Sequence, residues 1–346
     1  MSMSPSAPAT VVERFEPEEW PAGQISRLLL QLAHDGLSRP IELPVLVARG
    51  AKPGPILGLT AALHGNELNG IPVIRRLFER LDPKTLRGTV VGVIVVNVPG
   101  YLNHERGYGQ WDLNHMFPGN PRGNAASVYV SRLVDRLVRR LNLLVDLHTA
   151  SVGRVNSLYV RADMTNPEAA RIAYLQRPQI IVHNPPSDMT LRGAAAELGI
   201  PAVTVEIGNP QRFHSDYIKR TLTGLRAVLA DQHMIRTRAV KLGPPPVLCE
   251  RSYWTYTDHG GLLEVSPEVT EHVEAGQTVA RLTTPFGDLI AEYAVPEAGV
   301  VVGHSVNPVA ETGARILHVG VPAVDGDPRF HQREAVGSTE SGSDED

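Results

Sequence analysis

Residues 56–70 read ILGLTAALHGNELNG. The first eight, 56–63, are almost all apolar and predict a buried strand that ends at a polar, glycine-containing corner. Apolar residues then recur with helical spacing through residues 71–81. A buried strand that leads directly into a helix is typical of one unit of an α/β fold.

The same alternation of strands and helices continues along the chain. We expect further strands at 90–98, 143–148, 179–183 and 202–207, and helices at 130–141, 167–176, 191–198 and 216–233. The run 90–98 is rich in β-branched residues without polar alternation, which is typical of a strand covered on both faces. The fold class predicted is α/β, a mixed, mostly parallel sheet with helices on both faces.

A proline-rich stretch, Gly243–Pro246, ends this alternation, and we interpret it as a linker. Beyond it, short apolar runs separated by turns predict a small all-β domain at residues 247–322. The α/β domain then spans residues 11–243. We expect disorder in the Ser/Pro/Ala-rich residues 1–10 and in an acidic tail at 323–346.

Composition excludes several classes of protein. The 346 residues include 33 Lys plus Arg and 37 Asp plus Glu, which gives a net charge of −4. Residues 323–346 contribute −5 of this, so the rest of the chain is close to +1 and lacks the basic charge of a nucleic-acid binder. Only one cysteine, Cys249, is present, and no secretory signal is seen, so we expect a reducing, cytoplasmic location. No apolar run is long enough to span a membrane.

Metal-ligand side chains follow two of the predicted strands. His64 and Glu67 lie three residues apart just past the strand 56–63, and His148 ends the strand 143–148. In open α/β sheets, ligands bind beyond the carboxyl ends of strands, where both segments fall. One Glu and two His form a ligand set typical of catalytic zinc, which leaves a position open for water. The sequence predicts one Zn²⁺ per subunit held by these residues; each alone is equally explained as a surface polar group or a core histidine.

A further carboxylate, Glu206, lies near the end of the predicted strand 202–207. Burial of a carboxylate is costly unless the group has a partner or a function. We interpret Glu206 as the general base that deprotonates a metal-bound water and returns the proton to the leaving nitrogen. The alternative is a glutamate that pairs with an arginine or lies at the exposed rim of the sheet.

The polar, glycine-rich segment 103–123 also contains aromatic residues, which predicts a structured loop. Within it, Arg106 is a candidate to polarise a carbonyl or to stabilise the oxyanion of a tetrahedral intermediate. Asn114 is a candidate to hydrogen-bond a substrate carboxylate, and Asp112 to orient the loop or a ligand histidine. The alternative for Arg106 is a solvated loop cation.

Together these segments resemble the succinylglutamate desuccinylase/aspartoacylase family, whose members are relatives of the zinc carboxypeptidases. The resemblance covers most of residues 41–322 and includes GPILGLTAALHGNELNG, the DLN-x-FPG stretch, VDLHT and VTVEIG in the same order. It implies a zinc-carboxypeptidase-like fold and a zinc hydrolase that cleaves the amide bond of an N-acylated amino acid or related amine. The matching positions are His64, Glu67 and His148 for the metal ligands, Glu206 for the acid/base glutamate, Arg106 for the arginine at the scissile carbonyl and Asn114 for the carboxylate clamp.

The chain departs from the family's pattern at His115. The family usually has arginine there, in DLNR-x-FPG, whereas this sequence reads DLNHMFPG. A histidine cannot hold a carboxylate with the charged fork of an arginine, so the substrate-binding role of this position is changed. Arg122, Arg154 and Arg192 are candidates to compensate.

The C-terminal β domain resembles a biotinyl/lipoyl-like barrel sandwich. Covalent carrier function is excluded because no lysine follows Lys241. Tyr253, Trp254 and Tyr256 lie just past the linker, and we take Tyr256 as a candidate substrate-binding residue. The alternative is that these aromatic residues belong to the core or to a domain interface.

The sequence therefore predicts a zinc-dependent deacylase for a small N-acylated amino acid or amine, with no nucleic-acid or membrane partner. A homo-oligomer is compatible with the sequence. One alternative is a zinc carboxypeptidase acting on a short peptide, but His115 weakens the hold on a terminal carboxylate that such an enzyme needs. The other is a non-catalytic zinc-containing binding module, and the presence of Glu206 argues against it.

Overall fold

The computed structural model describes residues 8–186, 189–236 and 243–330. Apolar strands form the centre of its larger sheet. β5 (Arg87–Val93), β4 (Lys52–Ala61), β6 (Leu143–His148) and β10 (Ala202–Ile207) lie side by side and pair in parallel. Every residue of β6 is buried, as expected for a strand covered on both faces.

Further strands extend this sheet on both sides. They are β1 (Thr10–Val12), β2 (Gln24–His34), β3 (Pro40–Arg49), β7 (Arg154–Asn156), β8 (Leu158–Ala162), β9 (Ile180–His183), β11 (Val247–Tyr256), β13 (His272–Val273), β16 (Gly299–Ser305) and β18 (Arg315–Pro322). Across the described residues the order is β1-β2-β3-β5-β4-β6-β10-β8-β9-β11-β18-β16-β13, and β7 pairs with β16. A second sheet contains β12 (Gly261–Val265), β14 (Thr278–Thr283), β15 (Leu289–Ala294) and β17 (Val309–Ala310).

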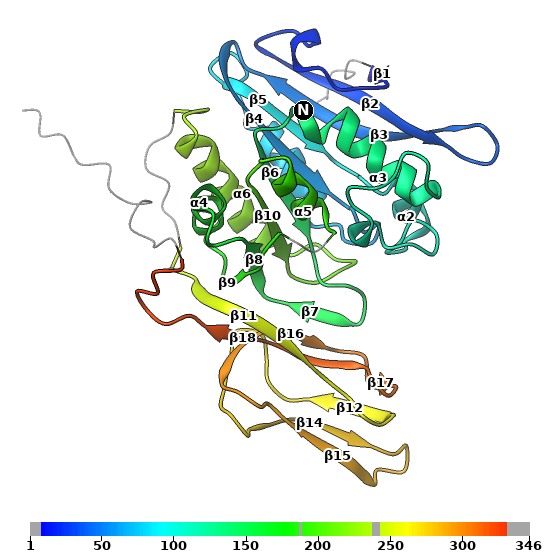
Figure 1. Cartoon of the computed structure of the whole chain (residues 1–346), viewed down its shortest axis with the longest axis vertical. Coiled ribbons are helices and arrows are strands. Elements are labelled where there is room, and N and C mark those ends of the chain that lie inside the picture. The colour runs from blue at the N-terminus through cyan, green and yellow to red at the C-terminus, as the bar shows by residue number, and fades with distance from the viewer. Residues whose placement is uncertain (1–7, 187–188, 237–242, 331–346) are drawn as a thin grey trace, which may run out of the picture.

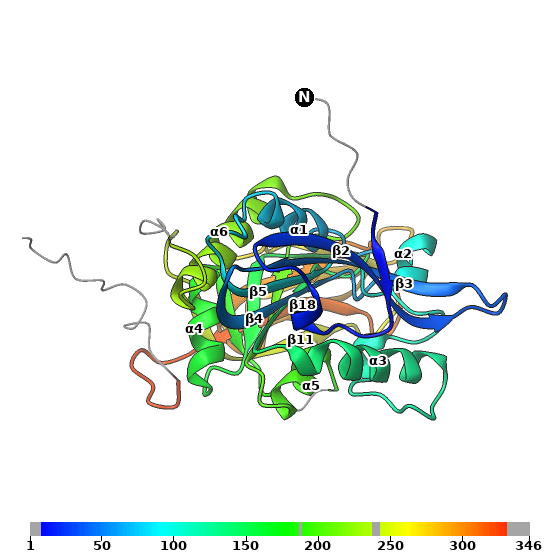
Figure 2. The same ribbon diagram turned by 90° about the horizontal axis from the view of Figure 1, so that it is seen from above.

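Helices cover both faces of the larger sheet, which confirms the predicted fold class (Figure 2). Buried side chains of α1 (Gly70–Phe78), α4 (Pro167–Leu175) and α6 (Ser215–Asp231) form one hydrophobic core against it. Those of α3 (Ala125–Arg136) and α5 (Leu191–Glu197) form a second core on the opposite face. Shorter helices are α2 (Val98–Asn103), η1 (Pro17–Glu19), η2 (Leu113–His115) and η3 (Val138–Arg140).

The predicted elements correspond closely to the observed ones. The strands expected at 143–148 and 202–207 coincide with β6 and β10. The strand expected at 90–98 ends at Val93, because the chain turns there and enters α2 at Val98. The helix expected at 130–141 begins earlier, at Ala125, where Asn124 caps its first turn.

The C-terminal region is all-β, as predicted, and it continues the larger sheet (Figure 1). β11 pairs in parallel with β9 and antiparallel with β18, while β16 pairs with β7. The Gly243–Pro246 stretch leads directly into β11. Backbone hydrogen bonds therefore join the two regions, and the boundaries 11–243 and 247–322 stay predictions.

The expectation of disorder from residue 323 onward is wrong for residues 323–330. The Ala323 N–H donates to the Leu248 carbonyl at 2.8 Å. Phe330 is buried, with its ring centroid 4.9 Å from that of His183. An apolar side chain late in the acidic segment thus anchors it to the fold. The expectation of disorder for residues 1–10 is also wrong at Thr10, which lies in β1. Residues 1–7 and 331–346 lie outside the described residues.

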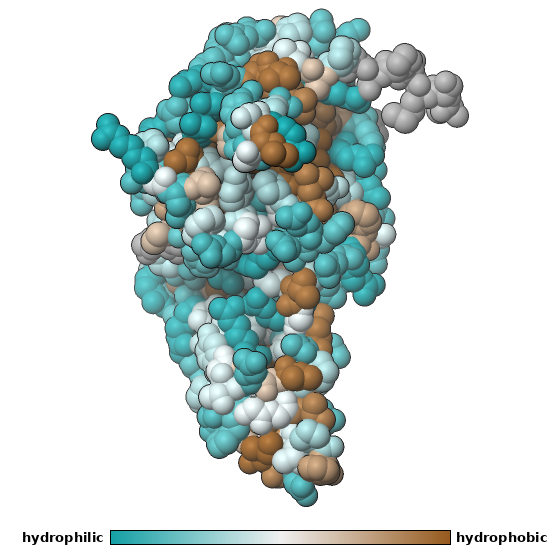
Figure 3. All heavy atoms as spheres, turned by 90° about the vertical axis from the view of Figure 1, so that its right-hand side faces the viewer, coloured by the Kyte–Doolittle hydropathy of each residue, from teal (hydrophilic) through white to brown (hydrophobic). Residues whose placement is uncertain are grey.

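The surface agrees with the moderate charge of the sequence. Hydrophilic side chains cover most of the face in Figure 3, with separate hydrophobic patches near the top and along the all-β region. Within the described residues, no helix combines the length and the apolar character needed to cross a membrane.

Candidate active site

The corner after β4 brings the first two predicted ligands to the edge of the sheet. Glycine is required at position 65, between His64 and Glu67, because a Cβ there would lie 2.1 Å from the carbonyl carbon of Gly100. The Gly65 N–H donates to the Arg106 carbonyl at 3.2 Å. The close backbone approach at glycine thus places His64 and Glu67 next to the loop that carries Arg106.

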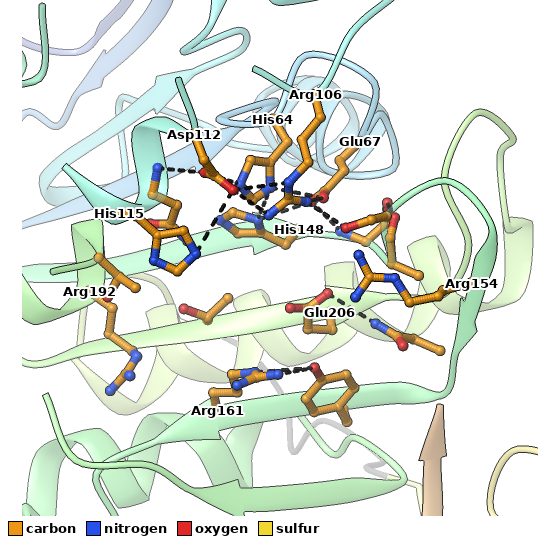
Figure 4. Close-up of a pocket in the computed structure, with 18 of the residues that line it drawn as sticks. His64, Glu67, Arg106, Asp112, His115, His148, Arg154, Arg161, Arg192 and Glu206 are labelled. Carbon is orange, nitrogen blue, oxygen red and sulfur yellow. Dashed lines mark hydrogen bonds and ion pairs between the residues drawn. The ribbon is translucent and has the colours of Figure 1, made fainter. Parts of the chain in front are cut away.

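His64, Glu67 and His148 converge on one buried point (Figure 4). The Nδ1 atom of His64 lies 2.8 Å from Glu67 Oε1, and that of His148 lies 3.0 Å from Glu67 Oε2. The two Nδ1 atoms are 3.2 Å apart. Two imidazole nitrogens and a carboxylate directed at one point form a donor set that fits a divalent metal ion. The structure therefore brings the predicted ligand set together.

Carboxylates fix the opposite nitrogen of each imidazole. His64 Nε2 lies 3.0 Å from Asp112 Oδ1, and His148 Nε2 lies 2.7 Å from Asp146 Oδ2. The Thr60 hydroxyl donates to the other oxygen of Asp146 at 2.6 Å. Such partners hold the proton on the outer nitrogen and direct the inner one at a metal. Asp112 thus contacts a ligand histidine, one of its two expected roles, whereas sequence reasoning missed Asp146. Its signal was the two-residue spacing to His148, which puts both on one face of β6.

The charges of this group balance each other. Burial alone would raise the pKa of Glu67, but His64 and His148 hold it well below its usual value. Burial opposes charge on His148 too, yet Asp146 and Glu67 raise its pKa well above the usual value. The pKa of Asp112 is lowered against the effect of burial, chiefly by His64. Positive charge is thus favoured at the point where the ligands meet, and a metal ion supplies such charge.

Glu206 lies beside His148, its register partner on the neighbouring strand. Its carboxylate accepts a hydrogen bond from the Asn156 side-chain amide at 3.3 Å. No Arg, Lys or His nitrogen among the described residues lies within 4 Å of it, unlike in the ion-paired alternative. Burial raises the pKa of Glu206, which suits a group that must accept and return a proton.

Arg106 extends from its loop to the metal-ligand group. Its Nε and Nη2 donate to Asp112 Oδ2 at 3.1 and 2.9 Å. Its Nη1 donates to Glu67 Oε1 at 2.8 Å and to the Ser151 hydroxyl at 2.6 Å. Arg106 is therefore a fixed guanidinium on the cavity wall rather than a solvated loop cation.

Of the remaining predicted substrate-binding residues, some line the cavity and one does not. Asn114 lines the cavity, and its side-chain oxygen accepts the Leu191 N–H at 3.0 Å, which ties the loop to the start of α5. His115 also lines the cavity, but its side chain is 71% exposed and its Nε2 lies 3.9 Å from Asp112 Oδ2. Tyr256 is half exposed and does not line the cavity. Trp254 does so instead, and a register irregularity in β11 separates the two aromatic residues.

All these cavity-lining residues surround one space of about 510 Å³. Four further arginines line it: Arg154 on β7, Arg161 on β8, Arg192 on α5 and Arg315 on β18. Arg192 is buried and donates to the carbonyl and side-chain oxygens of Asn184 at 2.9 and 2.7 Å. Sequence reasoning considered Arg154 and Arg192 but missed Arg161 and Arg315. Arg122, the other compensating candidate, does not line the cavity.

Comparison with known proteins agrees with this geometry. The family model described as the succinylglutamate desuccinylase/aspartoacylase catalytic domain matches residues 53–231. The chain belongs to this family. All three metal-ligand candidates, Arg106 and Glu206 fall inside the matched catalytic domain. The family membership makes the protein a hydrolase that acts on amide bonds, as predicted.

Two curated members illustrate the range of the family. The chain is 24% identical to an N-alpha-acetyl-L-2,4-diaminobutyric acid deacetylase from Halomonas elongata over 275 residues, which are 75% of this chain and 80% of that protein. It is 26% identical to a succinylglutamate desuccinylase from Pseudomonas aeruginosa over 174 residues, 46% of this chain and 52% of that protein. The two enzymes are named for different acyl groups, so the comparison leaves the acyl group of this chain's substrate open.

Solved structures of the family share the fold. A succinylglutamate desuccinylase/aspartoacylase from Rhodobacter sphaeroides superimposes with a TM-score of 0.79 at 20% identity, covering 87% of this chain and 96% of that one. The product-bound ectoine utilization protein EutE from Ruegeria pomeroyi gives 0.78 at 21% identity, covering 86% and 95%. Both alignments cover too much of the chain to omit the all-β region, which therefore belongs to the shared architecture.

Proposed function

We propose that this protein is a zinc-dependent deacylase that hydrolyses the amide bond of an N-acylated amino acid or related amine. The observation that carries the proposal is one cavity in which Glu206 lies beside the converging His64, Glu67 and His148. Among the described residues, no ion pair neutralises the Glu206 carboxylate. A metal-ligand group without such a carboxylate would suit a structural site, whereas this arrangement suits the activation of water.

His64, Glu67 and His148 would hold the zinc ion. When bound, the ion polarises the acyl carbonyl and lowers the pKa of a water molecule toward neutrality. Asp112 and Asp146 keep the inner nitrogens of the two histidines free to bind it, because they accept the protons of the outer nitrogens.

Glu206 takes a proton from the attacking water, whose oxygen bonds to the acyl carbon. The carbon–nitrogen bond then breaks, and Glu206 returns the proton to the leaving nitrogen, so the products are a carboxylic acid and an amine. Arg106 lies on the cavity wall, braced by Asp112, where it donates to the carbonyl oxygen as negative charge develops.

The amine half of the substrate lies, in this proposal, toward Asn114 and His115. Asn114 is held by α5, and its neighbour His115 is at the exposed margin of the cavity. Arg192 lies on the same side in Figure 4 and supplies the guanidinium that His115 lacks. The expected cytoplasmic location is supported by the single cysteine, Cys249, a buried free thiol.

Incubation of the zinc-loaded protein with a panel of N-acetyl and N-succinyl amino acids and amines tests the proposal. Mass spectrometry should detect free acid and free amine in equal amounts from at least one compound. Release of C-terminal residues from short peptides, without acyl release, would instead identify a carboxypeptidase. Ligand-induced stabilisation without any product would identify a binding module.

A further inference from the structure

Asn156 lies where the chain passes from the all-β region to the strand beside the proposed base. Its own strand, β7, pairs with β16, whereas the next strand, β8, pairs with β10, which carries Glu206 (Figure 1). Between β7 and β8, the N–H and the hydroxyl of Ser157 both donate to the Val302 carbonyl of β16 at 3.0 Å. Asn156 is therefore fixed between β16 and the strand of Glu206.

The side chain of Asn156 contacts both of these neighbours. Its amide nitrogen donates to Glu206 Oε2 at 3.3 Å, the bond drawn at Glu206 in Figure 4. Its Oδ1 faces β16 so closely that a Cβ on Gly303 would lie 2.3 Å from it. The Asn156 backbone N–H donates to Asn209 Oδ1 at 3.3 Å, and the residue is 8% exposed. The amide is thus held with its NH₂ group toward the carboxylate, which can only accept hydrogen bonds when ionised.

Glu206 depends on this contact for its orientation. Among the described residues, no ion pair neutralises its carboxylate, and the Asn156 amide is the donor that reaches it. A donor on Oε2 leaves Oε1 available to accept a proton from water. The placement of such a group matters, because a shift of about 1 Å can lower a rate by about 10²-fold.

We infer that Asn156 is a positioning residue for Glu206, and that β16 sets the place of Asn156 through Gly303. The inference rests on the proposed function, because it takes Glu206 as the group that carries the proton. Glycine at position 303 allows the close approach of β16, and this approach directs the Asn156 amide at Glu206. The all-β region thereby acts on the rate of the reaction through the proposed base.

Steady-state hydrolysis of an N-acyl amino acid by the zinc-loaded protein tests the role of Asn156. Asn156→Ala removes the donor and should lower kcat about tenfold, with KM and bound zinc unchanged within about twofold. Asn156→Ser keeps a small polar side chain beside β16 but is too short to reach Glu206, so it should lose a similar factor. Asn103→Ala, at an exposed position outside the cavity, is the matched control. Wild-type kcat in both Asn156 variants would overturn the inference.

Combination with Glu206→Gln separates positioning from a merely structural role. If Asn156 acts through Glu206, Asn156→Ala should not lower the residual rate of the Glu206→Gln variant further. The same tenfold loss in both backgrounds would overturn the inference. A crystal structure of the Asn156→Ala variant gives a readout other than activity. It should show the Glu206 carboxylate displaced and the metal-ligand side chains in place, and an unmoved carboxylate would contradict the inference.

Gly303→Ala tests the contribution of β16. The added methyl group displaces Asn156 and should lower kcat by about three- to tenfold. It should have little further effect after Asn156→Ala, because the amide through which it acts is then absent. Gly260→Ala is the matched control in the all-β region, since the nearest atom to a Cβ there lies at 3.4 Å. Equal kcat for the two glycine variants would reject the role of β16.

The same measurements separate this inference from the proposed function. Hydrolysis that is lost in Glu206→Gln but unchanged in the Asn156 variants would retain the deacylase and reject the positioning role. Absence of hydrolysis of every N-acyl compound by the wild-type protein would reject the proposed function, and the inference with it.

Discussion

The two sides of the cavity differ in whether their charged groups are paired with groups of opposite charge. On the metal-ligand side, each imidazole has a carboxylate partner within 3.0 Å, and Arg106 pairs with both Glu67 and Asp112. On the side of Arg154 and Arg315, no carboxylate of the described chain lies within ion-pair distance. The protein itself pairs the charges on the first side, whereas on the second side both guanidinium groups lie over the ring of Trp254.

Under the proposed function, this difference separates two tasks of one cavity. A catalytic centre benefits from side chains that are already fixed, since no reorganisation is then needed during the reaction. A binding subsite gains selectivity from groups that are unsatisfied until the correct ligand arrives. Substitutions on the first side should therefore change turnover and metal binding, and those on the second side should change the choice of substrate.

Glu206 is the exception on the metal-ligand side, because no described residue forms an ion pair with it. Its substitution should have the largest effect. Glu206→Gln removes the proton acceptor and should lower kcat by about 10²- to 10⁴-fold. Metal content, measured by mass spectrometry, should not change. Glu264→Gln, at an exposed position of β12, is the matched control. Turnover within threefold of wild type would show that another group moves the proton.

The carboxylates behind the histidines should control metal affinity. Asp146→Asn weakens the acceptor for His148 Nε2 and should lower metal affinity by about 10- to 100-fold. Competition with a chromogenic chelator measures the change. Asp325→Asn, an exposed carboxylate outside the cavity, should leave the affinity unaltered. Equal metal affinities for the Asp146 variant and wild type would mean that the contact of Asp146 with His148 does not support metal binding.

The arginines around Trp254 should also affect how the free energy of unfolding depends on pH. His318 is stacked on Trp254, and burial together with Arg161, Arg315 and Arg154 holds its pKa well below the usual value. Its unfolded-state pKa is near 6.5, so the unfolded chain binds the extra proton as the pH falls below 6.5. The free energy of unfolding should then decrease by up to about 1.4 kcal/mol per pH unit from this group.

The His318→Gln variant should show a shallower decrease, whatever its stability at neutral pH. Urea unfolding of the metal-free proteins at pH 7.5, 6.5 and 5.5 compares the two slopes. Parallel slopes would indicate that the neighbouring arginines do not keep His318 neutral.

Two aromatic residues of β11 provide the smallest and sharpest contrast. Trp254→Ala should raise KM for an N-acyl substrate by roughly tenfold, because Arg154 and Arg315 lose the ring that positions them at the cavity. Tyr256→Ala should change KM by less than about twofold, since its side chain is half exposed outside the cavity. Steady-state kinetics measures KM for the two variants. Equal increases in KM would indicate that Tyr256 also contacts the substrate.

The sequence was sufficient to predict that the candidate catalytic residues lie together, because they follow buried strands. His64, Glu67, His148 and Glu206 lie at strand ends, where the topology of a parallel sheet brings them to one edge. Arg315 could not be placed in this way. Its approach to Arg154 depends on the pairing of β7 with β16 and of β16 with β18, which no local pattern encodes.

The hairpin of β2 and β3 was missed for a different reason. β3 contains Pro40 and Pro44, and proline within a run argues against a strand. In the structure the Pro44 carbonyl still accepts a hydrogen bond from the Ile94 N–H at 2.9 Å. Tertiary pairing thus overrode the local signal. The burial of Phe330 similarly depends on distant residues, including His183.

Simultaneous measurement of bound zinc and hydrolysis tests the central claim most directly. Zinc is added stepwise to metal-free protein, and the rate of amide hydrolysis is recorded against the ion bound per chain. We predict that the rate rises in proportion to bound zinc and stops rising at one ion per chain. His148→Ala should bind little of this zinc and remain inactive. Full hydrolysis by the metal-free protein, or by the His148 variant, would contradict the account.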